Sequence, residues 1–163
     1  MFKLSFLSVG SEPDDTNLYS PAQGNCLDIT ACPDATFSKK ILGDGFMVIP
    51  ETNMICSPCD GTVENIFPTL HAFGIRMKNE AEVMIHIGLE TVKLNGNGFR
   101  TFVQKGDTVK AGEPLAEFDA AFMKEKQIDM STMVVLLGTA EAPHTKLNLN
   151  KHVNIKDMVI RID

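Results

Sequence analysis

Residues 81–94 constrain the fold of this chain more than any other stretch, because their aliphatic side chains recur at every second position. That period is typical of a β-strand with one face in the core. The expected core face carries Val83, Ile85, Ile87 and Leu89, and the opposite face carries Glu82, Met84, His86, Gly88 and Glu90. His86 would then stand on a rigid backbone beside a small residue, which leaves its imidazole accessible.

A second alternating strand is expected at residues 69–77, with one face formed by Thr69, His71, Phe73 and Ile75. Only residues 78–81 separate it from the next strand, so the two favour a β-hairpin. In antiparallel pairing centred on that turn, His71 and His86 lie at about equal distances from it. The two imidazoles are therefore expected to face each other across neighbouring strands.

Two facing histidines have three candidate uses. They can be packed and hydrogen-bonded in the core. They can bind zinc, although a catalytic zinc site needs a third ligand and neither His nor Asp recurs at the expected spacings. Alternatively, one imidazole accepts a phosphoryl group while the other polarises its oxygens, since neutral imidazole is nucleophilic near pH 7. His144 and His152 lie among polar, loop-like residues and receive no role.

The rest of the chain alternates short strands with proline and glycine turns. The pattern S-P-x-x-G-x-x-x-x-I occurs at residues 20–29 and again at 57–66, which indicates a duplicated turn and strand. The further expected elements are a turn at 105–115 and strands at 132–137 and 158–162. The one convincing helix is 120–127, which Asp119 can cap. Regular turns with almost no helix predict an all-β sandwich or barrel.

Composition narrows the class of protein. With 163 residues, 44% hydrophobic and 22% charged, the chain is expected to fold as one domain, residues 19–163, behind a flexible extension of residues 1–18. The net charge of −6 argues against a nucleic-acid binder. No apolar run reaches the roughly 18 residues of a membrane span, and the N-terminus is a poor secretory signal. The expected location is therefore the cytoplasm.

Two local motifs are interpreted as structural. The C-x-x-C at residues 56–59 lacks the similarly spaced second pair that a zinc site needs, because Cys26 and Cys32 are spaced differently. The four cysteines are expected to be reduced thiols that act as small apolar residues. The Gly-Asp-Gly at residues 43–45 lacks the spacing of a phosphate-binding loop, so we expect a turn there and a strand at 46–49.

Residues 70–75 and 85–99 resemble the two histidine motifs of the enzyme IIA component of the sugar phosphotransferase system, glucose type. Residues 37–45, the S-P-x-x-G turn and residues 105–112 fit the same family, and the resemblance covers about residues 19–162. It implies a compact antiparallel β-sandwich built from a duplicated barrel-sandwich hybrid motif, with one or two very short helices. It implies no cofactor and no metal.

The resemblance also implies a mechanism. His86 would take a phosphoryl group on Nε2 from the phosphohistidine carrier protein HPr and pass it to a cysteine of the enzyme IIB domain of a sugar permease. His71 would stabilise the phosphoryl group without being phosphorylated itself. The Gly88 carbonyl would accept from His86 Nδ1–H, which fixes the tautomer, and Thr69 would orient His71.

Members of this family dock both partners, HPr and the enzyme IIB/IIC permease, on one shallow face, and meet the membrane only through the permease. The positions matching their apolar ring are Phe37, Leu42, Phe67, Met84 and Val92, and those matching their acidic rim are Asp34 and Glu90. The chain departs from the family pattern in three places. Glu90 replaces the more usual aspartate, Cys59 replaces a valine or leucine, and residues 78–81 lack the common glycine.

Other functions are weighed against this one. A lipoyl or biotinyl carrier would use Lys124, which would have to lie at a hairpin tip but falls in the expected helix. A metallopeptidase of the same duplicated fold would lack its third metal ligand. A non-catalytic regulatory relative would have lost transfer, against which the presence of both histidines argues. Met1 and the unmatched extension favour a separate protein over a domain of a fused permease.

Overall fold

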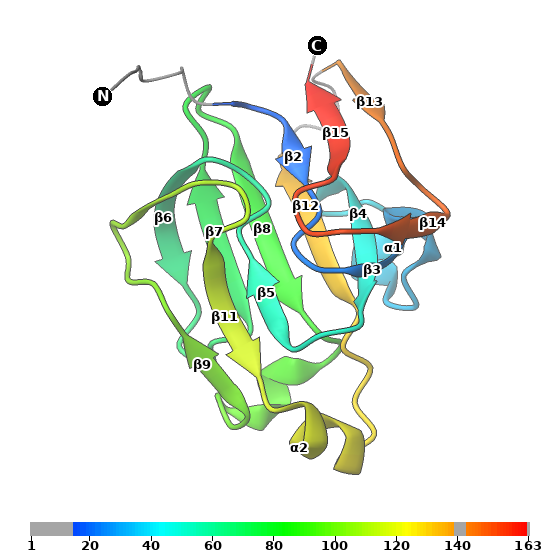
Figure 1. The fold of residues 1–163 in the computed structure, drawn as a ribbon, viewed down its shortest axis with the longest axis vertical. Helices are drawn as coiled ribbons and strands as arrows, with labels where there is room; N and C mark the ends of the chain where they lie inside the picture. Colours follow the sequence, from blue (N-terminus) through cyan, green and yellow to red (C-terminus); the bar gives the residue numbers. More distant parts are fainter. Residues whose placement is uncertain (1–14, 139–142, 163) are drawn as a thin grey trace, which may run out of the picture.

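The computed structural model describes residues 15–138 and 143–162, and most of its regular structure is antiparallel β-sheet (Figure 1). The described strands are β2 (Leu18–Tyr19), β3 (Gly24–Asp28), β4 (Gly43–Pro50), β5 (Met54–Cys56), β6 (Gly61–Ile66), β7 (Ala72–Arg76), β8 (Glu82–Ile87), β9 (Phe99–Thr101), β10 (Thr108–Val109), β11 (Pro114–Phe118), β12 (Thr132–Leu137), β13 (His144–Lys146), β14 (Lys151–Val153) and β15 (Met158–Ile162). The described helices are α1 (Ala35–Ser38) and α2 (Ala120–Glu125), with the 3₁₀ helices η2 (Ile29–Ala31) and η3 (Thr91–Leu94). The all-β prediction is confirmed.

The strands form one large sheet and two small ones. Within the described residues, the large sheet has the order β10-β6-β7-β8-β12-β4-β3-β14, and the small sheets have the orders β5-β11-β9 and β13-β15-β2. The order of the large sheet is symmetric about the β8–β12 pair, so that β6 corresponds to β3 and β7 to β4. The duplication predicted from the sequence is thus present in the topology.

The two S-P-x-x-G turns are built alike and bind each other. The hydroxyl of Ser20 and that of Ser57 each donate to the carbonyl two residues further on, at 2.7 and 2.6 Å. Both serines are fully buried, so these bonds satisfy hydroxyls that water cannot reach. The bonds between the turns are Tyr19 N–H to Pro58 O at 2.7 Å and Cys56 N–H to Pro21 O at 2.8 Å.

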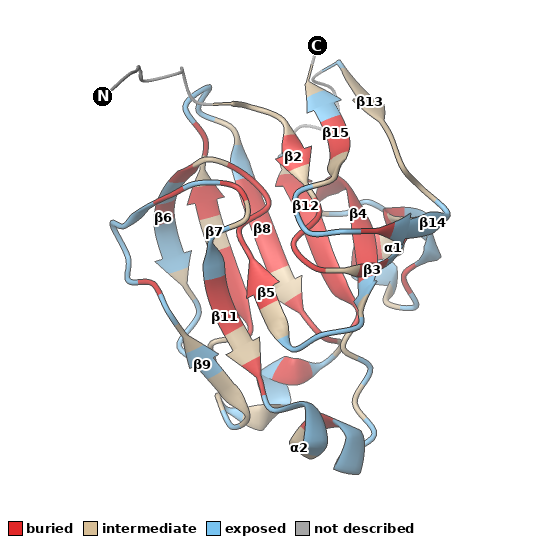
Figure 2. Cartoon of the chain, in the orientation of Figure 1, coloured by how far each residue is buried: buried red, intermediate tan, exposed pale blue. Residues whose placement is uncertain are grey.

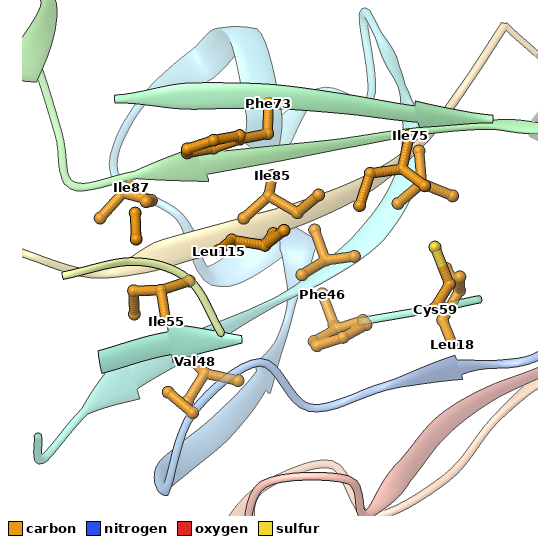
Figure 3. Close-up of a cluster of buried hydrophobic side chains, with 14 of the residues drawn as sticks. Leu18, Phe46, Val48, Ile55, Cys59, Phe73, Ile75, Ile85, Ile87 and Leu115 are labelled. Carbon is orange, nitrogen blue, oxygen red and sulfur yellow. The ribbon is translucent and has the colours of Figure 1, made fainter. Parts of the chain in front are cut away.

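The main core lies between the large sheet and the small sheets (Figure 3). Phe73 and Ile85 reach it from β7 and β8, and Ile55 and Leu115 reach it from β5 and β11. Figure 2 shows buried residues running along the middle strands of the large sheet and along β5 and β11. The alternation predicted for β8 is therefore correct as far as Ile87, which also belongs to this core.

A second buried cluster covers the opposite face of the large sheet. Residues 29–42, which contain η2 and α1 and are called the cover segment below, pack there over β4, β8 and β12. The buried members of the second cluster are Ile29, Cys32, Phe37, Met47, Met84, Met133 and Val135. Since alternate residues of a strand point to opposite faces, each central strand is buried on both sides.

Two expected strand boundaries are wrong. The strand expected at residues 81–94 ends at Ile87, because Gly88 and Glu90 adopt positive φ angles of 81° and 57° and turn the chain. Leu89 accordingly packs against the second cluster and not in the main core. The strand expected at 69–77 begins only at Ala72 and ends at Arg76.

The Gly-Asp-Gly motif is not a turn, contrary to expectation. Residues 43–45 open β4 and pair with β12. A Cβ on Gly45 would lie 2.0 Å from the Val134 carbonyl oxygen, so glycine permits a close approach of the two strands. Asp44, between the glycines, is buried and accepts hydrogen bonds from His144 and Lys146.

The strands expected at 132–137 and 158–162 match β12 and β15, and Asp119 caps α2 by accepting from Phe122 N–H at 3.0 Å. Helix α2 ends two residues earlier than expected, and Gln127 beyond it has a positive φ. Lys124 lies in this helix and not at a hairpin tip, which argues against a lipoyl or biotinyl carrier. Leu18, expected in the extension, is fully buried in β2. Residues 1–14 lie outside the described residues, so the flexible extension stays a prediction.

Candidate functional site

His86 lies near the end of β8, on the face of the large sheet that carries the second cluster. Its Nδ1 is 2.9 Å from the Gly88 carbonyl oxygen. The positive φ of Gly88 turns that carbonyl back towards the strand, and Gly88 N–H donates to Ser131 O at 3.0 Å. Because a carbonyl oxygen can only accept, the proton of neutral His86 lies on Nδ1, and Nε2 carries the free lone pair.

His71 lies immediately before β7 and is almost fully buried. Its Nδ1 shares a hydrogen bond of 2.7 Å with the Thr69 hydroxyl. Leu70 between them has a φ of +61°, so residues 69–71 form a turn and not the regular strand expected. His71 O accepts from Ile87 N–H at 2.7 Å, which joins this turn to the end of β8.

The two imidazoles meet, as predicted, with ring centroids 4.8 Å apart and planes inclined by 81°. The predicted pairing is shifted by one residue, because Ala72 and not His71 lies opposite His86 in the ladder. The turn at Leu70 nevertheless brings the His71 ring against His86.

Burial keeps both imidazoles uncharged near neutral pH. Burial and the neighbouring His71 together lower the pKa of His86 to about 4. Burial also lowers the pKa of His71, and an interaction with the Thr69 backbone acts in the opposite direction. A charged imidazole has no nucleophilic lone pair, so the site favours the state in which His86 can attack an electrophile.

Aromatic side chains flank the pair. Phe37 from α1 meets His86 edge-on with centroids 5.1 Å apart, and Phe67 meets His71 at 5.6 Å. Phe37 is buried, whereas Phe67 is 37% exposed and Val92 on η3 is 50% exposed. Met84 and Leu42, the other expected ring positions, belong to the second cluster. The expected ring is therefore partly an extension of a buried cluster and partly open surface.

The two expected acidic residues are placed differently. Asp34 caps α1 by accepting from Thr36 N–H at 2.9 Å, and its charge acts on His86. Glu90 is exposed and pairs with Lys93 at 2.6 Å. Ile41, near the end of the cover segment, is 67% exposed and was not among the residues predicted for this surface. Its only signal was its position beside Leu42 in an apolar pair.

Residues without an expected role lie elsewhere. His144 Nε2 is 2.9 Å from Asp44, and His152 Nε2 is 3.0 Å from Glu51. The four cysteines are free and buried, and burial raises the pKa of Cys59 to about 12. None of the helices in the described part of the chain combines the length and apolar character needed to cross a membrane.

Comparison with known proteins gives consistent matches. The family described as phosphoenolpyruvate-dependent sugar phosphotransferase system, EIIA 1, matches residues 16–142. A glucose-specific EIIA component of Bacillus cereus is 38% identical over 146 residues, which cover 90% of this chain and 88% of that protein. A glucoside-specific EIICBA component of Staphylococcus carnosus is 40% identical over 134 residues, and the match spans only 19% of that longer protein.

The fold also matches a solved structure. Glucose permease IIA from Mycoplasma capricolum superposes with a TM-score of 0.76 at 32% sequence identity. The match covers 91% of this chain and 96% of that one. The likeness therefore extends over nearly the whole of both chains.

Proposed function

This chain belongs to the EIIA family of the phosphoenolpyruvate-dependent sugar phosphotransferase system, and we propose that within that system it carries a phosphoryl group on Nε2 of His86. The observation that carries the proposal is the 2.9 Å contact between His86 Nδ1 and Gly88 O. It commits the proton to Nδ1 and leaves Nε2 as the nucleophile. The depressed pKa of His86 keeps that lone pair free near pH 7.

The carrier works in two transfers. In the first, the Nε2 lone pair attacks the phosphorus of phosphohistidine on HPr, a new N–P bond forms, and the HPr imidazole leaves with the electron pair of the old bond. In the second, a thiolate of enzyme IIB attacks the same phosphorus, an S–P bond forms, and Nε2 recovers its lone pair. The phosphoryl group passes from protein to protein and not to water. Since both partners act in the cytoplasm, we place this protein there as well.

His71 stabilises the phosphoryl oxygens and is not itself phosphorylated. We assign the Thr69 hydroxyl, 2.7 Å from His71 Nδ1, as the donor of that bond. This assignment puts the His71 proton on Nε2, the nitrogen that can donate to the phosphoryl group. Donors fixed in place before the reaction stabilise a loose phosphoryl-transfer transition state without reorganising. The positive ring that forms on His86 keeps its Nδ1–H bonded to Gly88 O.

Both partners dock on the surface around the histidines. Phe67 and Val92 supply exposed apolar area there, and Asp34 and Glu90 supply negative charge for basic partners. Several relatives are EIICBA components, in which the matching segment is part of a longer chain. The acceptor is therefore proposed to be the enzyme IIB domain of a sugar permease with its IIC membrane part.

Incubation with enzyme I, HPr and phosphoenolpyruvate tests the proposal. We expect one acid-labile phosphate per chain, lost in His86→Ala. The His71→Gln variant should still accept phosphate and fail to pass it to enzyme IIB. Phosphate on another residue, or none, would refute the assignment, and the latter result is what a purely regulatory relative would give.

A further inference from the structure

Lys146 on β13 binds a carboxylate at each end of the cover segment. Its Nζ donates to Asp28 Oδ1 at 2.6 Å and also to Asp44 Oδ1. Asp28 immediately precedes the segment and caps η2 by accepting from Thr30 N–H at 3.1 Å. Asp44 lies just beyond the other end, on β4. One ammonium group thus bridges the entry and the exit of the segment, which the β3–β4 ladder also joins through the pairing of Asp28 with Phe46.

This cluster is shielded from water. The side chain of Lys146 is 14% exposed and that of Asp44 is 10% exposed. Burial alone would raise the pKa of Asp44, but hydrogen bonds from Lys146 and His144 bring it down to about 2. Lys40, inside the cover segment, lies 3.4 Å from the same carboxylate. Removing one partner from such a buried cluster is strongly destabilising, because the remaining charge is left uncompensated.

The backbone of the cover segment has few other attachments. In the described part of the chain, the hydrogen bonds made by backbone groups of residues 29–41 stay within the segment or reach Asp28. The first backbone bond to the rest of the molecule is from Gly138 N–H to Leu42 O, at 3.0 Å. The middle of the segment is therefore held by apolar packing, including that of Phe37 beside His86, and by its two ends.

We propose that Lys146 is a positioning residue for partner docking: by tying Asp28 to Asp44 it fixes the cover segment, and with it Phe37 and Asp34, beside His86. This inference rests on the proposed function of His86. Without the tie the segment samples several arrangements, and the apparent affinity for a docking protein falls with the fraction that is competent to bind. The imidazole of His86 stays neutral at pH 8 even when the segment moves, because its pKa then lies between about 4 and the roughly 6.5 of a free histidine.

The test compares phosphorylation of three variants by phospho-HPr over a range of concentrations. Lys146→Met removes the ammonium, Lys146→Arg restores a cation, and Lys151→Met alters an exposed lysine of β14 as a control. We expect KM for phospho-HPr to rise about tenfold in Lys146→Met with kcat nearly unchanged. Lys146→Arg should recover part of the loss, and Lys151→Met should behave as the wild type.

Two further readouts separate positioning from general damage. At pH 8, where His86 is neutral in both proteins, phosphoramidate, a small donor that needs no docking face, should phosphorylate Lys146→Met at the wild-type rate. Amide hydrogen exchange should quicken in residues 30–41 of the same variant, while the amides of β8 keep their protection.

An unchanged KM, or unchanged exchange in residues 30–41, overturns the proposal. The proposal is also overturned if Lys146→Met loses as much reactivity towards phosphoramidate as towards phospho-HPr, because that would mean damage at His86 itself. If wild-type protein takes no phosphate from phospho-HPr, the proposed function fails instead, and hydrogen exchange still tests the tie. If Lys146→Met does not fold, Asp28→Asn, which keeps the Lys146–Asp44 pair, is measured in the same way with a smaller rise in KM expected.

Discussion

The side chain of Thr91 fills the space beside Gly88 that a larger residue would need. A Cβ on Gly88 would lie 2.5 Å from Thr91 Cγ2 and 3.0 Å from Met130 Sδ. The Thr91 hydroxyl donates to Ile87 O at 2.6 Å, so it also fixes the residue that precedes the glycine. Thr91 therefore fixes the turn that presents the Gly88 carbonyl to His86 both by packing and by a hydrogen bond.

Replacing Gly88 by alanine tests this crowding. Gly88→Ala adds strain from a positive φ of 81° and a clash with Thr91, and we expect a loss of about 3 kcal/mol in the free energy of unfolding. Gly138→Ala is a matched control, because Gly138 has a φ of 80° and nothing within 4 Å of the added Cβ. It should lose about 1 kcal/mol. Urea unfolding measures both, and equal losses would contradict the role given to Thr91.

Replacing Thr69 by valine removes the hydroxyl that bonds His71 and keeps the shape of the side chain. A buried imidazole nitrogen then loses its partner, which should cost about 1–2 kcal/mol of stability. We expect transfer from phosphorylated His86 to enzyme IIB to slow about tenfold, as a displaced donor costs about 1.4 kcal/mol of barrier. Rapid-quench kinetics measure the rate, with Thr62→Val on the exposed side of β6 as the control. An unchanged transfer rate would remove Thr69 from the mechanism.

The pKa of about 4 for His86 predicts a pH dependence of stability. An unfolded histidine titrates near pH 6.5, so between about pH 4 and 6.5 the unfolded chain binds more protons than the folded one. Stability should therefore fall as pH falls through that window, by roughly 3 kcal/mol from this residue. His86→Gln, which cannot titrate there, should show a shallower decline in urea unfolding. An equal decline in both proteins would contradict the assignment of this pKa to His86.

The same pKa predicts how the reaction depends on pH. Phosphate acceptance from phosphoramidate should stay flat from pH 8 to about pH 5 and decrease below it, as protonation occupies Nε2. Initial rates corrected for donor breakdown measure this. A decline centred near pH 6.5, the value of a free histidine, would show that burial does not control the nucleophile.

Asp44 offers a test of the buried charges. Asp44→Asn leaves Lys146 with Asp28 as its remaining acidic partner, and we expect a loss of about 3 kcal/mol in the free energy of unfolding. Glu51→Gln is the matched control, since Glu51 forms an exposed pair with His152. It should change stability by less than about 1 kcal/mol. Comparable effects of the two substitutions would contradict the importance of burial at Asp44.

Local patterns in the sequence predicted much of this fold. The period of two located β8, and proline, glycine and aspartate located the turns and the cap of α2. The short hairpin correctly predicted that His71 approaches His86. It did not predict the register of the two strands, in which Ala72 lies opposite His86. A left-handed residue such as Leu70 shifts the pairing by one, and leucine gives no sign of that conformation in the sequence.

Contacts between distant residues could not be predicted. Lys146 is 118 residues from Asp28 and 102 from Asp44, and each looks like an ordinary surface charge in the sequence. The Gly-Asp-Gly motif was misread for a related reason. Its glycines are required by the close approach of the β12 carbonyls, about 90 residues further along, and not by a local turn.

The symmetry of the large sheet means that the two connections beside the histidines occupy equivalent places in the fold. The β6–β7 connection carries Phe67, Thr69 and His71, and the corresponding β3–β4 connection is the cover segment with Asp34 and Phe37. The β6–β7 connection has five residues and the β3–β4 connection has fourteen. Under the proposed function the shorter one supplies His71, and the longer one supplies Asp34 and Phe37 to partner docking. Substitutions in the longer connection are then expected to change partner choice while His71 and its contacts stay in place, since the two connections lie on opposite halves of one sheet.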